Sequence, residues 1–119
     1  MPNKLIFDGR MAQAPELRSA GDTKVCKFRL LRNEHTGTNS DGSKRGPRTV
    51  GLNFTAFGSK GEAIAQHVRT GDQLIVEARI ENNNYTDGEG REHYDLNIIV
   101  TDFDFGAPGE ATRAAIANR

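Results

Sequence analysis

The chain of 119 residues is long enough for one domain with a single core, and its formal net charge is zero. Hydrophobic residues make up 35% and charged residues 27%, which is typical of a soluble globular protein, and no apolar run approaches the ~20 residues of a membrane-spanning helix. The N-terminus lacks the apolar stretch of a signal peptide and the single cysteine excludes an internal disulfide, so we expect a cytoplasmic location.

Alternation of apolar and polar residues with period 2 predicts five β-strands along the chain. Their expected ranges are about 3–10, 24–31, 49–57, 74–81 and 93–105. In the second strand, Cys26 and Phe28 fall on the face that is expected to line the core. Lys27 and Arg29 fall on the opposite face, as does Phe57 at the end of the third strand.

Residues 59–69 break this alternation, because apolar residues recur near helical spacing and a Thr-Gly stop signal follows. They predict one short helix. Turn residues predict loops at 11–23, 34–47 and 82–92, and the last lies between two strands as a long hairpin. We expect residues 1–105 to form one domain and residues 106–119 to form a flexible tail or a short frayed helix.

This order of elements matches the OB-fold, a partly open Greek-key barrel. We therefore predict an all-β fold. It is a five-stranded OB-fold barrel with one short helix between strands 3 and 4 and a long hairpin between strands 4 and 5. Several small barrels share a similar element order, so the order alone does not distinguish the OB-fold from them.

Charge is distributed unevenly along the chain. Residues 23–50 contain seven Lys/Arg and two acidic residues, a net charge of +5, whereas residues 70–105 contain two Lys/Arg and nine acidic residues, a net charge of −7. A basic surface for nucleic acid would produce this pattern, and so would two solvated faces of opposite sign. Charge alone therefore leaves both interpretations open.

Short sequence pieces connect the chain to a known family. They are residues 3–6 (NKLI) followed by Gly9, 15–18 (PELR), 25–28 (VCKF), 57–58 (FG), 69–77 (RTGDQLIVE) and 85–87 (YTD) with Gly90. In order and spacing they resemble the bacterial single-stranded DNA-binding protein family. The resemblance implies non-catalytic, sequence-independent binding and protection of single-stranded DNA in replication, repair or recombination. It also implies a homo-oligomer, with a tetramer favoured over a dimer, in which first strands pair.

Binding a flexible strand without reading its sequence requires cations for the phosphates and rings on which the bases stack. The candidate cationic residues are Lys27, Arg29, Arg32, Lys44, Arg45 and Arg48. The resemblance places aromatic residues at about four positions, and two of them keep a ring here, Phe57 and Tyr85. The other two fall at Thr36 and Gly51, so His35, beside Thr36, is the candidate to compensate.

No set of residues with catalytic or metal-ligand spacing is evident, so we expect neither enzymatic activity nor a cofactor. Cys26 is expected to be a buried, inert thiol. Two alternatives use the same fold. One is a replication-restart accessory protein that acts mainly through protein–protein contacts, and the other is an enzyme subunit whose OB domain positions a substrate.

Two features depart from the family that the chain resembles. The family usually ends in an acidic tip that recruits replication and repair enzymes, whereas here only Glu110 is acidic after Asp104. We therefore do not expect recruitment by such a tip, and the chain is either truncated or a variant. Asp8 lies in the first strand, where the family tends to be apolar, and argues against the usual pairing of first strands.

Overall fold

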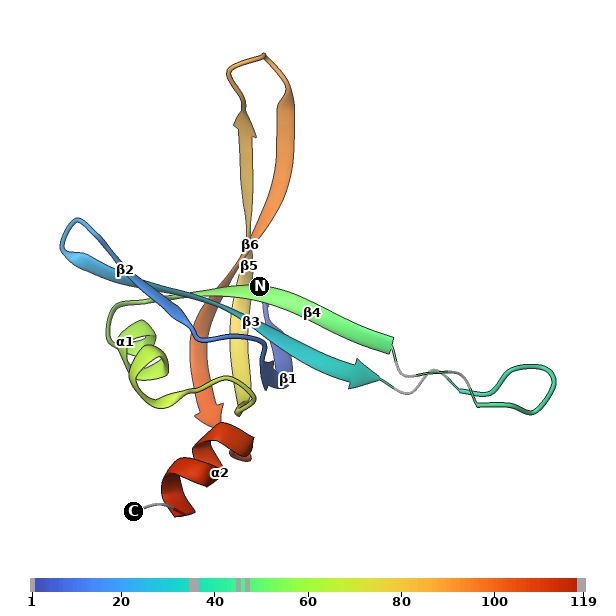
Figure 1. Ribbon diagram of the computed structural model, residues 1–119. Helices are drawn as coiled ribbons and strands as arrows, with labels where there is room; N and C mark the ends of the chain where they lie inside the picture. Colours follow the sequence, from blue (N-terminus) through green and yellow to red (C-terminus); the bar gives the residue numbers. More distant parts are fainter. Residues whose placement is uncertain (1, 35–36, 45, 47, 118–119) are drawn as a thin grey trace.

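β-Strands form most of the chain and close into a barrel from which hairpin arms extend (Figure 1). The computed structural model describes residues 2–34, 37–44, 46 and 48–117. The strands are β1 Leu5–Met11, β2 Glu16–Ala20, β3 Thr23–Glu34, β4 Arg48–Phe57, β5 Gln73–Thr86 and β6 Glu92–Phe105. The helices are α1 Gly58–His67 and α2 Glu110–Ala117. Neither helix is long and apolar enough to cross a membrane in this described part of the chain.

Five strands form a closed ring in the order β1, β5, β6, β4 and β3. The ring closes because β3 pairs back onto β1 at Arg10 and Met11. Neighbouring strands are antiparallel except β4 and β6, which run parallel at Thr55 and Ile99. Among these five strands, α1 lies between the third and fourth in chain order, and the β5–β6 hairpin joins the fourth and fifth. The predicted OB-fold barrel is confirmed.

One strand and parts of two others lie where loops are predicted. Strand β2 falls inside the predicted 11–23 loop and pairs with β3, but all five of its side chains are exposed. Most of the predicted 82–92 loop is also paired strand, from Asn82 opposite Leu96 to Thr86 opposite Glu92. Period-2 alternation arises where one face of a strand is buried. These arms pair through the backbone but bury neither face, so their sequences show no alternation.

The barrel core consists mainly of the apolar faces that the alternation predicts, joined by Met11 from a predicted loop and Ile64 from α1. Its largest fully buried side chains are Phe54, Met11, Leu30, Ile64, Leu74, Val76 and Cys26. The rings of Phe28 and Phe54 stack across β3 and β4 with centroids 5.5 Å apart. Helix α1 packs closely against the barrel at Gly61, where a Cβ atom would lie 3.1 Å from the Cβ of Cys26. Cys26 is buried as predicted, and burial raises the pKa of its thiol to about 11.

A buried carboxylate connects α2 to the loop that precedes β5. Asp72 accepts hydrogen bonds from the backbone N–H of Gly109 at 2.7 Å, the N–H of Arg69 at 2.9 Å and the hydroxyl of Thr112 at 2.9 Å. Burial opposes ionisation of this group, but these hydrogen bonds outweigh it and lower the pKa of Asp72. Residues 110–117 form a helix that the hydroxyl of Thr112 connects to this carboxylate, and the boundary between a domain of residues 1–105 and a tail stays a prediction.

Candidate nucleic-acid interface

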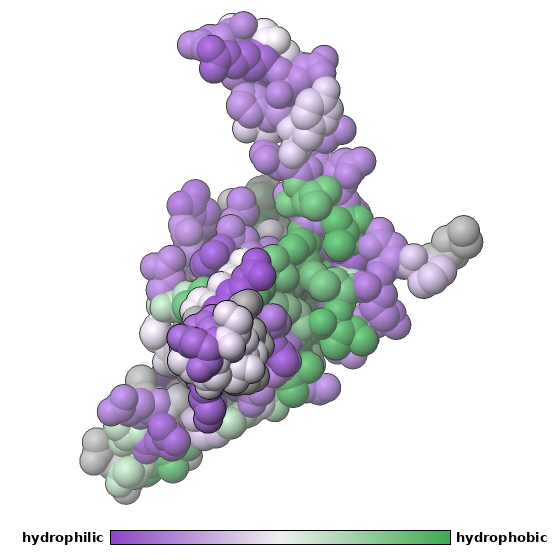
Figure 2. Space-filling view, turned by 90° about the vertical axis from the view of Figure 1, so that its right-hand side faces the viewer, coloured by the Kyte–Doolittle hydropathy of each residue, from purple (hydrophilic) through white to green (hydrophobic). Residues whose placement is uncertain are grey.

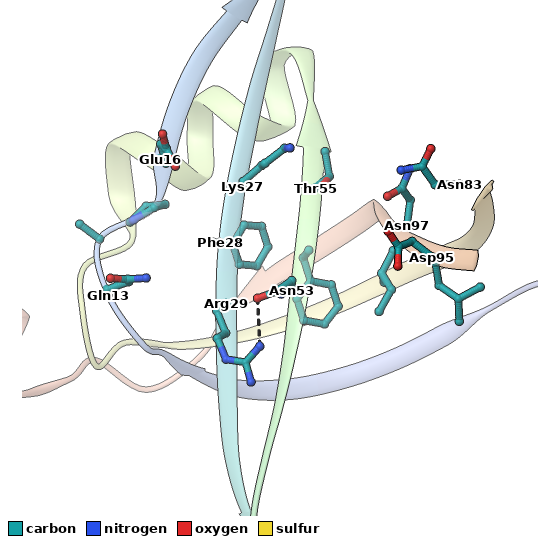
Figure 3. A pocket seen from close by; sticks show the side chains of 15 residues that line it. Gln13, Glu16, Lys27, Phe28, Arg29, Asn53, Thr55, Asn83, Asp95 and Asn97 are labelled. Carbon is teal, nitrogen blue, oxygen red and sulfur yellow. Dashed lines mark hydrogen bonds between the residues drawn. The ribbon is translucent and has the colours of Figure 1, made fainter. Parts of the chain in front are cut away.

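A groove runs across one face of the barrel, between the β2–β3 arm and the base of the β5–β6 hairpin (Figure 3). It has a volume of about 850 Å³. An adjoining pocket of about 420 Å³ shares five of its lining residues and extends the groove toward Phe57. The shared residues are Glu16, Lys27, Thr55, Asn83 and Asn97. The groove is therefore built from segments that lie far apart in the sequence.

The floor of the groove is the outward face of β3 and β4. The register places Lys27 opposite Thr55, Arg29 opposite Asn53 and Val25 opposite Phe57, and the side chains of such pairs share one face. The ring of Phe57 is 45% exposed. Strand parity thus puts Lys27, Arg29 and Phe57 together on one exposed surface. The core residues of the same strands lie on the opposite face.

Amide side chains converge on the groove from several segments (Figure 3). Gln13 precedes β2, Asn53 lies on β4, Asn83 on β5 and Asn97 on β6. Each amide carries both a donor and an acceptor, so a flip of the group can match the hydrogen-bonding edge of different bases. The sequence places Asn53 on the outward face of its strand, but Asn83 falls in a predicted loop, and nothing in the sequence indicates that the four amides meet.

Acidic side chains reduce the positive charge of the groove. Glu16 and Asp95 line it together with Lys27 and Arg29. Glu16 forms an ion pair with Arg18, so its charge is compensated within the β2–β3 arm. Among the described residues, no ion pair joins a carboxylate to Lys27 or Arg29. These two cations are therefore available for phosphates.

Tyr85 lies outside the groove, on the β5–β6 hairpin. Its ring is 47% exposed and stacks on His93, with centroids 4.7 Å apart and an interplanar angle of 12°. His93 Nε2 lies 2.8 Å from Asp87 Oδ2, and this hydrogen bond is the main reason why the pKa of Asp87 is lowered. The backbone N–H groups of Glu89 and Arg91 also donate to Asp87, which fixes the turn beneath the tyrosine.

The remaining predicted cations are spread over the β3–β4 arm and its base. Arg32 forms ion pairs with Asp8 and Glu34, so its charge is largely compensated. Arg48 lies opposite Glu34 at the start of β4, and Lys44 forms an isolated bridge with Thr38 in the projecting loop. His35 and Arg45 lie outside the described residues. Of the candidates that the structure describes, Lys27, Arg29 and Phe57 lie together, whereas Arg32, Lys44, Arg48 and Tyr85 lie outside the groove.

Comparisons with known proteins relate the chain to proteins that bind single-stranded DNA. Residues 2–106 match the model of the single-strand binding protein family. A single-stranded DNA-binding protein of Clostridium perfringens (strain 13 / Type A) is 32% identical over 87% of this chain and 65% of its own length. Single-stranded DNA-binding protein 1 of Staphylococcus aureus (strain Mu50 / ATCC 700699) is 28% identical over 91% of this chain and 67% of its own length.

The family match covers nearly the whole chain, so the chain belongs to the single-strand binding protein family. It spans about two thirds of the length of the two relatives. The resemblance to this family is confirmed, and membership identifies a binding protein rather than an enzyme, as predicted. The roles of the individual site residues stay predictions.

Proposed function

We propose that this chain binds single-stranded DNA of any sequence and protects it during replication, repair or recombination. The observation that carries the proposal is the groove floor, where Lys27, Arg29 and Phe57 share one exposed face. Cations there neutralise phosphates, and the ring of Phe57 stacks on a base, a contact that contributes roughly 1–3 kcal/mol. Stacking tolerates any base because every base has a π-face.

The alternative of a replication-restart accessory protein is not favoured. Both relatives described above are named for binding single-stranded DNA. The β5–β6 hairpin also suits a nucleic-acid ligand, since its base borders the groove at Asn83 and Asn97 and it carries the exposed Tyr85 further out. A strand leaving the groove along this hairpin would meet a stacking ring.

We extend the proposal to a homo-oligomer, with a tetramer favoured over a dimer. Residues 5–9 of β1 pair with β5 alone, and an open strand edge is a template for pairing with a second copy. Ile6 on this strand is 69% exposed, and Figure 2 shows a band of hydrophobic side chains on this side of the molecule. Asp8 bonds Arg32 and Gln73 within the protomer, so its charge need not oppose pairing. Sedimentation equilibrium measures the stoichiometry.

We place this function in a reducing cytoplasm and assign it to residues 1–105, with residues 106–119 appended as a tail. The unpaired, buried thiol of Cys26 supports the compartment. The family match, which ends at residue 106, supports the boundary. A chain truncated after residue 105 tests the boundary, because it should retain the affinity of the full chain for oligo(dT).

A salt-dependent titration with poly(dT), duplex DNA and poly(U) tests the proposed function. We expect binding to poly(dT) that is tight, dependent on length and much stronger than binding to duplex DNA. Lys27→Ala should reduce the slope of log K against log salt by about 0.7, the value for one phosphate contact on a single strand. Lys4→Ala is the matched control, since Lys4 pairs with Glu77 away from the groove. Equal binding of duplex and single strands would contradict the proposal.

A further inference from the structure

The guanidinium group of Arg29 occupies the place where residue 51 would carry a side chain. A Cβ atom on Gly51 would lie 2.8 Å from Cζ and 2.9 Å from Nε of Arg29, and closer still to Nη2. Gly51 lies opposite Leu31, two residues along β4 from Asn53, the partner of Arg29, and so on the same face of the strand. Because glycine has no side chain, the arginine can lie directly against the strand, and any other residue at position 51 would displace it.

A hydrogen bond holds the guanidinium group in this position. Arg29 Nη1 donates to Oδ1 of Asn53 at 3.0 Å, as the dashed line in Figure 3 shows. Asn53 is the cross-strand partner of Arg29, so the register of β3 and β4 fixes the pair. Among the described residues, no carboxylate forms an ion pair with Arg29. The group is thus oriented by a neutral amide, Arg29 is only partly buried, and its charge is not paired with a carboxylate in that part of the chain.

The position of this pair in the groove suits a base rather than a phosphate alone. Arg29 and Asn53 line the groove, and Phe57 lines the adjoining pocket that extends it. Asn53 and Phe57 both lie on β4. Phe57 lies four positions after Asn53, which corresponds to about 13 Å at the rise of a β-strand. A planar guanidinium stacks on aromatic bases, whereas a lysine ammonium at the same point would only neutralise charge.

We propose that Arg29, oriented by Asn53 over Gly51, is a stacking platform for one base of the bound single strand. This inference rests on the proposed function and names a specific contact within it. Phe57 and Arg29 then hold two bases of the same strand at separate points of the groove. The amides between them contact the edges of the intervening bases. The chain, which contains no tryptophan, thereby gains a planar surface from a cation.

Arg29→Lys separates the plane of the side chain from its charge. The probes are oligo(dT) of about 16 nucleotides, the upper end of the span that one OB-fold covers, and an abasic strand of the same length. We expect Arg29→Lys to weaken binding of oligo(dT) about 5- to 100-fold, with an unchanged salt slope, and to leave binding of the abasic strand nearly unchanged. Arg79→Lys is the matched control, because Arg79 pairs with Glu81 and lies outside the lining of the groove, and it should bind both strands like the wild type.

Two outcomes would overturn the platform. One is wild-type affinity of Arg29→Lys for oligo(dT), and the other is an equal loss on the oligo(dT) and abasic strands. If the wild type itself fails to bind oligo(dT), the proposed function fails instead, so the two failures are distinguishable. Gly51→Ala provides an independent variant that keeps Arg29 but displaces its guanidinium group, and it should lose affinity for oligo(dT) while keeping the wild-type salt slope.

A rescue variant tests whether any planar side chain at this point of the groove supports binding, or only the arginine. Arg29→Ala combined with Gly51→Trp removes the guanidinium and puts an indole ring at the same point of the strand. We expect the double variant to bind oligo(dT) more tightly than Arg29→Ala, with quenching of its single tryptophan fluorescence on binding. Unquenched fluorescence together with no gain in affinity would show that no base lies over position 51.

Discussion

The two halves of strand β5 lie in different surroundings, although the backbone pairs with β6 along both. In residues 73–78 burial alternates, with Leu74, Val76 and Ala78 buried in the barrel. In residues 79–86 every side chain is exposed, because this half leaves the barrel as a hairpin arm (Figure 1). Backbone pairing is thus continuous across a boundary at which side-chain burial stops.

The difference shows how this fold can separate stability from binding. In the barrel half, each buried side chain is constrained by its packing partners, so substitutions there should change the free energy of unfolding. In the arm, only backbone hydrogen bonds and local contacts such as Tyr85 on His93 hold the strand. Side chains of the arm are therefore free to contact a ligand. Substitutions in the arm should change binding rather than the free energy of unfolding.

The largest expected effect lies in the barrel half of β5. Leu74 is fully buried, so Leu74→Ala should lower the free energy of unfolding by about 2–5 kcal/mol through lost burial and the cavity left behind. Ile75→Ala, one residue along, is the control, because Ile75 faces outward and is 37% exposed. Urea denaturation measures both variants. Similar losses of unfolding free energy for the two variants would contradict the distinction between the buried and exposed faces of β5.

The second prediction concerns the exposed rings. Phe57→Ala and Tyr85→Ala should each weaken binding to single strands by roughly 1–3 kcal/mol and leave the melting temperature nearly unchanged. Phe105→Ala is a control for an exposed ring that lies outside the groove. Fluorescence anisotropy and thermal unfolding measure the two quantities. Unfolding of Phe57→Ala without a separate loss of binding would assign Phe57 to the core rather than to the ligand.

The third prediction tests how Asp72 stabilises the loop before β5. Its pKa is lowered in the folded chain, so its contribution is complete above the ordinary pKa of about 4 and is lost as pH falls through the lowered value. Asp72→Asn leaves backbone donors imperfectly paired and should cost about 1–3 kcal/mol at neutral pH. Unfolding measured from pH 7 to acid should show a smaller pH dependence for the variant. Parallel profiles would exclude this role.

The smallest expected effect concerns a cation whose charge is already compensated. Arg32 pairs with Asp8 and Glu34, so Arg32→Ala should leave the slope of log K against log salt nearly unchanged. Lys27→Ala should reduce this slope by about 0.7. Titrations with poly(dT) at several salt concentrations compare the two variants. A reduction for Arg32→Ala as large as that for Lys27→Ala would show that Arg32 exchanges its partners for a phosphate.

Sequence parity predicted the barrel better than the arms. Cys26, Phe28 and Leu30 alternate with polar residues because one face of β3 packs in the core, and all three are buried. The same rule predicts that Lys27 and Phe57 lie on the opposite face, and both are exposed. Strand β2 and the paired arm around Asn83 lack a buried face and so carry no periodic signal. The alternation of apolar and polar residues therefore does not predict these strands.

The sequence by itself determined the order of the five barrel strands and α1, most of the core faces and the family. These properties depend on local periodicity and on residues at fixed spacing within each strand. Only the tertiary structure decided that Asn53, Asn83 and Asn97 meet in one groove, that Asp8 and Glu34 compensate Arg32, and that Arg29 lies over Gly51. Such contacts depend on strand register and on barrel closure, which join segments whose separation along the chain carries no local signal.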